Sequence, residues 1–314
     1  MIDNIERLKE FKISIGRIII EYIADESLSL KVFESHRGFI VKNGKPDLSI
    51  KVHYGKLPDL GLEEKLFDVR EKGGVWALYR SKENFELTLT SPFFGPEPYR
   101  VAMFDTDFTH GELYIRPYTS SGERDSLDKQ DISELPCCDP TAYPLDEVIY
   151  VNLLSRGRGV DLHACGVSIG NKGILFSGVS GAGKSTIAEL WKKRKVDLLS
   201  DDRIIVRRTD GHLMMYGTPW HGDAGISLPE KTPITAIFFL EQSKENRAVP
   251  LKPADAAFRL IVRSFPTFYS KEGMEYTLYF ITEIVQEIPC YELYFTPDDR
   301  AINTVLSHVE SITQ

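Results

Sequence analysis

Hydrophobic and polar residues alternate in short segments over the first 118 residues of the chain. Alternation with a period of two is typical of strands that bury one face. The clearest segments are 12–15, 48–52, 85–90 and 112–115. Turn pairs such as Asn43-Gly44 separate them. We therefore predict a β-rich N-terminal domain over residues 1–118. It carries no recognisable catalytic constellation, which favours a scaffold or a substrate-docking role.

Residues 119–141 interrupt this pattern. Residues 120–131 are polar and show no regular hydrophobic period. Such composition is typical of a linker or a surface loop. We predict a polar linker over residues 119–141.

Apolar residues at helical spacing occur in the second half of the chain. They predict a helix over 145–154, after Pro144, and another over 276–286. Short apolar runs that predict strands lie at 162–167, 174–176, 196–199, 204–206 and 291–295. Thr296 followed by Pro297 predicts the start of a last helix. Strands that alternate with helices predict an α/β domain over residues 142–314.

One segment between a predicted strand and a predicted helix (186–195) carries specific chemistry. Residues 178–185 fit the Walker A pattern Gly-x4-Gly-Lys-Ser without a mismatch. Glycines at these positions let successive backbone N–H groups face phosphate oxygens, and the helix N-terminus adds positive partial charge. Lys184 is expected to reach the β- and γ-phosphates, and the Ser185 hydroxyl to ligate Mg²⁺.

The alternative is a chance glycine-rich turn. At average residue usage the pattern occurs in roughly one chain in a hundred of this length, and the flanking strand and helix make chance rarer. We therefore predict a loop that binds ATP through Gly178, Val179, Ser180, Gly181, Ala182, Gly183, Lys184, Ser185 and Thr186.

Composition narrows the classes of partner. The 314 residues carry a formal net charge of −8 with a pI near 5.5. This acidity argues against nucleic acid or an anionic membrane as a general partner. No apolar run has the length of a membrane span or the layout of a signal peptide. The four cysteines show no zinc spacing, and a reducing, cytoplasmic compartment is the simplest interpretation.

Two further features flank the Walker A segment: a pair of aspartates after it and a histidine before it. A short apolar run ends in Asp201-Asp202, where a strand can deliver Mg²⁺ ligands or a base to phosphates. The same pair could instead form a plain turn. His163, in the predicted strand 162–167, would by itself more often be a core histidine. Its occurrence together with the carboxylates and the glycine-rich loop favours an active site.

Together these residues resemble the HPr kinase/phosphorylase group, whose C-terminal domain shares the phosphate-loop fold of phosphoenolpyruvate carboxykinase. The spacing agrees as well: His163 lies 21 residues before Lys184, and Asp202 lies 18 after it. The resemblance implies that Asp202 takes the proton from a substrate hydroxyl with support from His163. It also implies that Lys184 holds the γ-phosphate and that Ser185 holds Mg²⁺. In the mechanism that we expect, an acidic residue joins Ser185 at the metal, and we select Asp201.

The chain departs from that group in three places. Thr186 follows Ser185 where HPr kinases usually have Glu. Residues 217–223 stand where the group has its signature segment, and the β-rich first half differs from the group's N-terminal domain. The chain looks more like the divergent HPr-kinase-related proteins, which include kinases of free serine or of peptide hydroxyls. Related enzymes often assemble as oligomers, so a homo-oligomer is compatible with the resemblance.

The segment 219–223 has two interpretations. Its aromatic ring, imidazole and carboxylate could line a site, with Asp223 as a further metal ligand. The segment could equally form a rigid turn in which Trp220 packs. We favour the site, because the matching region of the family lines its active site.

Arginines can stabilise charge on a transferring phosphoryl group. Arg247, which follows the apolar run 237–240, is the best-placed candidate in the sequence. Arg259 and Arg263 come next.

The sequence therefore predicts an ATP- and Mg²⁺-dependent kinase with Asp202 as general base. Its acceptor would be a hydroxyl of a protein, a peptide or a small molecule such as free serine. Two other functions stay open: a nucleotide-binding switch with little catalysis, and a carboxykinase-like enzyme acting on a small acid.

Overall fold

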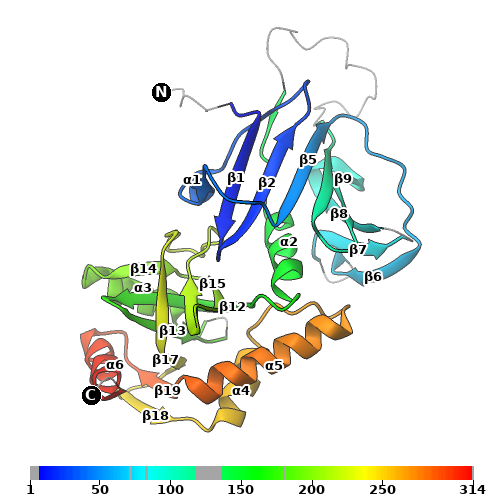
Figure 1. Ribbon diagram of the computed structural model, residues 1–314. Helices are drawn as coiled ribbons and strands as arrows, with labels where there is room; N and C mark the ends of the chain where they lie inside the picture. The colour runs from blue at the N-terminus through cyan, green and yellow to red at the C-terminus, as the bar shows by residue number, and fades with distance from the viewer. Residues whose placement is uncertain (1–6, 71–72, 82–83, 118–135, 180, 313–314) are drawn as a thin grey trace. The chain divides into compact units, whose positions relative to one another are not determined.

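The computed structural model describes residues 7–70, 73–81, 84–117, 136–179 and 181–312. The chain is a mixed α/β protein that divides into two compact units (Figure 1). Unit 1 comprises Met1–Ser14 and Ile18–Asp146, and unit 2 comprises Ile15–Arg17 and Glu147–Gln314.

Unit 1 is built on a nine-stranded sheet with the strand order β4-β1-β2-β5-β10-β9-β8-β7-β6. Its strands are β1 Glu10–Ile15, β2 Ile18–Ala24, β4 Ile40–Val41, β5 Leu48–Tyr54, β6 Glu64–Asp68, β7 Trp76–Arg80, β8 Asn84–Ser91, β9 Gly95–Asp105 and β10 His110–Ile115. A four-residue helix α1 (Glu34–Arg37) and a 3-10 turn (Pro92–Phe94) join strands. The alternation predicted for β5 is confirmed, because Leu48, Ile50 and Val52 are buried.

Most of the predicted linker lies outside the described residues, which resume at 136. Residues 136–141, which the predicted linker also includes, lie in unit 1. There β11 (Cys137–Cys138) pairs in parallel with β3 (Ser29–Leu30). The buried Asp139 carboxylate accepts hydrogen bonds from the Phe33 N–H at 2.7 Å and from the Thr141 N–H at 2.7 Å. Polar composition suggested a linker, but these partners satisfy the polar groups inside unit 1.

Unit 2 contains an eight-stranded sheet in which β12, β15, β16, β17 and β13 pair in a closed circuit. Its strands are β12 Val160–Ile169, β13 Lys172–Ser177, β14 Asp197–Ser200, β15 Arg203–Thr209, β16 His212–Tyr216, β17 Lys231–Gln242, β18 Arg247–Pro250 and β19 Cys290–Phe295. The helices are α2 Leu145–Leu154, α3 Lys184–Lys193, α4 Pro253–Ile261, α5 Lys271–Glu287 and α6 Asp299–Ile312.

Successive residues of the long strands enter two different cores. Leu162 and Phe239 pack in one core together with residues of α4 and α5. Cys165 and Phe238 pack in the other, with residues of α3 and α6. Figure 1 shows α5 and α6 on different sides of the strands of unit 2. Because helices cover both faces, these strands have continuous apolar runs such as 237–240.

Most predicted elements of unit 2 are present, with shifted ends. The last helix begins at Asp299 and not at Pro297. Asp298 precedes it, and its carboxylate accepts the Arg300 N–H at 2.9 Å, so an aspartate supplies the capping contact that we had assigned to Thr296.

The longest helix in the described part of the chain is α5, with 17 residues. Within the described ranges, no helix combines the length and apolarity that crossing a membrane requires.

Candidate active site

The glycine-rich segment lies between β13 and α3, as the sequence predicts. Gly181 and Gly183 adopt φ angles of +80° and +104°, which favour glycine. A Cβ on Gly183 would lie 2.6 Å from Cζ of Phe295 on β19, so the position also lacks space for a side chain. Ser180, part of the predicted loop, lies outside the described residues.

Hydrogen bonds hold the loop in place. The Ala182 N–H donates to the Val179 carbonyl at 3.0 Å. Gln242, at the end of β17, donates from Nε2 to the Gly181 carbonyl at 2.8 Å. Among the described residues, no side chain caps the N-terminus of α3 at Gly183. The first amides of this ten-residue helix therefore fit phosphate oxygens as partners.

Lys184 is buried, with 9% of its surface exposed. Its Nζ donates to the Gly178 carbonyl at 3.2 Å. Burial lowers the pKa of Lys184; the negative charge of Asp202 opposes this shift, whereas Arg203 and Arg263 add to it. Within the described residues no carboxylate pairs directly with the ammonium group. A buried cation in such a position fits a phosphate group as its counter-ion.

The structure brings His163 and Asp202 together. His163 Nε2 lies 2.8 Å from Asp202 Oδ1, and both side chains are partly exposed, at 28% and 27%. Pairing of β12 with β15 causes this contact, because His163 is the register partner of Arg203. Burial raises the pKa of Asp202, but the hydrogen bond from His163 and the Arg203 charge outweigh it, so the pKa is lowered. Asp202 is therefore ionised at neutral pH.

The sequence analysis gave no role to Arg203, although it directly follows Asp202. Arg203 donates from Nη1 to Asp202 Oδ2, and from Nε to Glu147 Oε1 on α2 at 2.6 Å. Its guanidinium carbon lies 4.1 Å from the centre of the Phe265 ring. The position of Arg203 directly after two aspartates could have indicated its role. Nothing in the sequence indicated Glu147, which lies 56 residues away from Arg203.

Asp161 is a second residue that the sequence analysis missed. It shares a face of β12 with His163, two positions away. Its side chain is 1% exposed, and neither carboxyl oxygen has a hydrogen-bond partner among the described residues. Burial and the nearby Glu147 raise its pKa well above the ordinary value. A raised pKa favours the protonated form of Asp161, close to the ionised Asp202.

Asp201, predicted to be a metal ligand, is engaged by backbone amides. Its Oδ1 accepts the N–H groups of Gly222 at 3.0 Å and Ile226 at 3.3 Å. Its Oδ2 accepts the N–H of Ala224 at 2.9 Å. With only 2% of its surface exposed, Asp201 holds the loop 222–226 in the structure.

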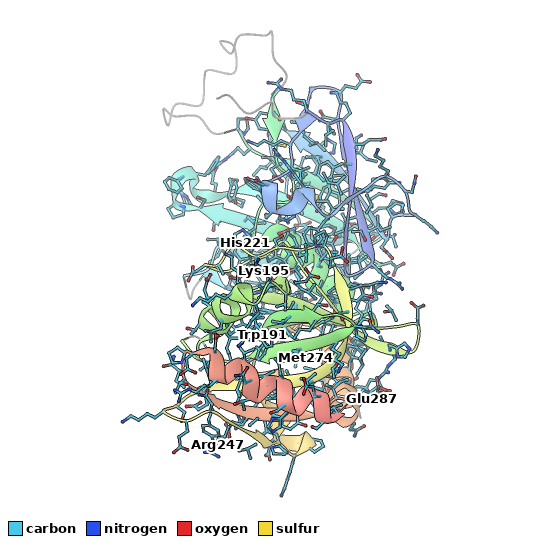
Figure 2. The ribbon with its side chains drawn as sticks, turned by 90° about the vertical axis from the view of Figure 1, so that its left-hand side faces the viewer. Trp191, Lys195, His221, Arg247, Met274 and Glu287 are labelled. Atoms are coloured by element: carbon cyan, nitrogen blue, oxygen red, sulfur yellow. The ribbon has the colours of Figure 1, made fainter. Side chains whose placement is uncertain are left out.

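This loop brings part of the segment 219–223 close to Asp202. A Cβ on Gly222 would lie 3.2 Å from Cβ of Asp202. Trp220 is buried and packs edge-on against Tyr150 of α2 at 5.5 Å, as the rigid-turn interpretation expected. His221, labelled in Figure 2, and Asp223 are exposed. The segment thus combines a packed tryptophan with exposed polar side chains.

The three candidate arginines differ in whether they contact the residues around His163 and Asp202. Arg247 on β18 lies over the ring of Tyr294, at 3.9 Å, and no contact among the described residues joins it to His163 or Asp202. Figure 2 shows it well separated from His221. Arg259 pairs with Glu292 at 2.7 Å. By contrast, the Arg263 carbonyl accepts the His163 N–H at 2.7 Å, and its charge affects Lys184.

A magnesium site would need the nucleotide to complete it. Within the described residues, no three His, Cys, Asp or Glu side chains form a group that could hold a metal. The Ser185 side chain is exposed at the start of α3, where its hydroxyl could serve as one ligand. Because Mg²⁺ usually binds through few protein ligands plus phosphate oxygens and water, the residues present fit such a site.

Comparisons with known proteins place few constraints on these residues. No protein-family model matches the chain. No curated protein matches it in sequence. Among solved structures, the chain is similar to the Hpr(Ser) kinase/phosphatase from Coxiella burnetii, with 14% sequence identity and a TM-score of 0.30. The match covers 49% of this chain and 99% of that chain. A similarity of this size assigns neither a family nor an activity.

Proposed function

We propose that unit 2 is an ATP- and Mg²⁺-dependent phosphotransferase of the HPr kinase type that phosphorylates a hydroxyl group. The observation that carries this proposal is the pairing of Asp202 with His163 at 2.8 Å, in electrostatic contact with Lys184 of the Walker A loop. A phosphate cradle alone binds nucleotide. An ionised carboxylate oriented by a histidine beside it supplies a proton acceptor as well.

In the proposed reaction the loop amides and Lys184 hold the β- and γ-phosphates. Ser185 would hold Mg²⁺, which when bound neutralises negative charge on the phosphates. The acceptor hydroxyl gives its proton to Asp202, while His163 keeps the carboxylate in orientation. Arg263 is a better-placed candidate than Arg247 for stabilising charge on the transferring group, because its backbone adjoins His163 and its charge reaches Lys184.

The proposed acceptor is a serine hydroxyl in a protein, a peptide or free serine. The proposed compartment is the cytoplasm. It supplies ATP, and its reducing conditions agree with four cysteines that form no disulfide in the structure. For magnesium, Asp223 is the more accessible of the two predicted carboxylates, since Asp201 is engaged by loop amides.

Label transfer from γ-labelled ATP into a cell lysate tests the proposal. Products are separated into macromolecular and small-molecule fractions, and Asp202→Asn is the matched control. We expect label in one fraction with the wild type, and a loss of at least about 100-fold with the variant, which retains ATP binding. Transfer by Asp202→Asn at the wild-type rate would refute the assignment of the base. Tight ATP binding with no transfer to either fraction would favour a nucleotide switch.

A further inference from the structure

The side chain of Arg203 is held on three sides. Glu147 contacts its Nε at 2.6 Å, Asp202 contacts its Nη1, and the Phe265 ring lies against its face. Arg203 and Glu147 are 13% and 8% exposed, so water competes little for their contact. A planar guanidinium with fixed neighbours at two edges and one face has a single orientation.

This orientation determines that of Asp202. His163 contacts Oδ1 of the carboxylate and Arg203 contacts Oδ2. Two partners on different oxygens fix the plane of a carboxylate, whereas one partner leaves it free to rotate. Each oxygen keeps a further lone pair that can accept a proton. The two contacts thus fix the direction of these lone pairs and leave them available to accept a proton.

We propose that Arg203 is a positioning residue for Asp202, and that Glu147 anchors Arg203 and affects phosphoryl transfer only through it. The inference rests on the proposed function of Asp202 as the proton acceptor. Glu147 lies on α2 and Asp202 follows β14, so the ion pairs join two elements that the chain places 55 residues apart (202 − 147).

Lysine cannot replace the arginine in this role. A guanidinium reaches Glu147 and Asp202 with different nitrogen atoms at the same time. An ammonium group is one point charge on a long side chain that can rotate, so it would hold one carboxylate or the other. Arg203→Lys therefore keeps the charge and removes the positioning.

The first experiment compares wild type with Arg203→Lys, Glu147→Gln and the double variant. It measures kcat for label transfer and KM for ATP, with free serine and the macromolecular fraction of a lysate as acceptor probes. We expect Arg203→Lys to lower kcat on the order of 100-fold and Glu147→Gln about 10-fold, with KM changed less than about threefold. The double variant should be no slower than Arg203→Lys, because Glu147 acts through the arginine.

Arg208→Lys is the matched control. Arg208 lies on the same strand and contacts both carboxylate oxygens of Glu287, one of them at 3.0 Å, in a surface pair away from Asp202. Its kcat should equal that of the wild type. A double variant whose losses multiply to about 1,000-fold, or variants whose loss is explained by a smaller folded fraction in thermal unfolding, would overturn the inference.

Crystal structures of wild type and Arg203→Lys separate this inference from the proposed function. In the variant we expect the Asp202 carboxylate to keep His163 and to rotate about that contact. An unchanged carboxylate plane would refute the positioning role whether or not the protein transfers phosphate. A wild type that transfers no label to either acceptor probe would refute the proposed function, and the two crystal structures would then decide the positioning role alone.

Discussion

Gly222 approaches Asp202 so closely that a Cβ at position 222 would lie 3.2 Å from the Asp202 Cβ. The same Cβ would lie 3.0 Å from Oδ2 of Asp201, which accepts the N–H of Ala224. The loop and Asp202 therefore pack against each other closely, so the size of the residue at position 222 affects the position of Asp202.

Gly222→Ala should impair both transfer and folding stability. The added methyl group forces Asp201 or Asp202 to shift by several tenths of an ångström, and overpacking of this kind costs about 1–3 kcal/mol. Displacement of the base should lower kcat by about 10-fold or more. Steady-state kinetics together with urea unfolding measures both quantities. A variant with wild-type kcat would show that the loop does not constrain Asp202.

Lys184→Ala should weaken nucleotide binding. Loss of a charged hydrogen-bonding group to phosphate removes about 1.5–3 kcal/mol, so we expect ATP to bind roughly 10- to 100-fold more weakly. Isothermal titration with a non-hydrolysable ATP analogue and Mg²⁺ measures the change. Lys192→Ala is the control, because Lys192 lies on the same helix and is exposed. Equal affinity in both variants would contradict a phosphate-binding loop.

Asp201→Asn separates two roles for this aspartate. An amide offers one acceptor oxygen to the three N–H groups of Gly222, Ala224 and Ile226, and its NH2 group opposes another donor. We expect the free energy of unfolding to fall by about 1.5–3 kcal/mol. The control variant Asp223→Asn, at an exposed position, should change the free energy of unfolding by less than about 0.5 kcal/mol. If Asp201→Asn instead keeps its stability and requires more Mg²⁺, Asp201 is a metal ligand.

Asp161→Asn should stabilise the protein at neutral pH. Burial raises the pKa of Asp161 in the folded protein, whereas the unfolded chain releases this proton near pH 4. The carboxyl group therefore lowers stability as pH rises above about 4, and the uncharged amide does not. Urea unfolding should show the variant to be more stable than wild type at pH 7, with the difference shrinking toward pH 4. A stability difference that does not change between pH 4 and pH 7 would contradict the raised pKa of Asp161.

The sequence predicted features that depend on neighbouring residues. The strand, glycine-rich loop and helix around Lys184 follow one another in the chain, so their pattern is visible locally. Helix α2 was predicted with its observed ends because Pro144 precedes an apolar helical pattern. The pairing of Asp202 with His163 spans 39 residues (202 − 163) and came only from the resemblance in spacing.

Features that depend on long-range packing could not be predicted in the same way. Glu147 and Arg203 meet only because helix α2 and strand β15 come together in the fold. Arg247 was preferred to Arg263 because it follows an apolar run, yet the backbone of Arg263 is the one bonded to His163. Residues 136–141 were included in the linker because they follow the polar stretch 120–131, and their partners, Phe33 among them, are more than 100 residues away.

The two cores that share β12 limit where the chain can change its length. Removing Asp161 would turn Leu162 toward the other face and His163 into the core that Leu162 now occupies. The two-residue turn at Gly170-Asn171 joins β12 to β13 without entering either core. We expect insertions, or the new ends of a circularly permuted variant, to be tolerated at that turn.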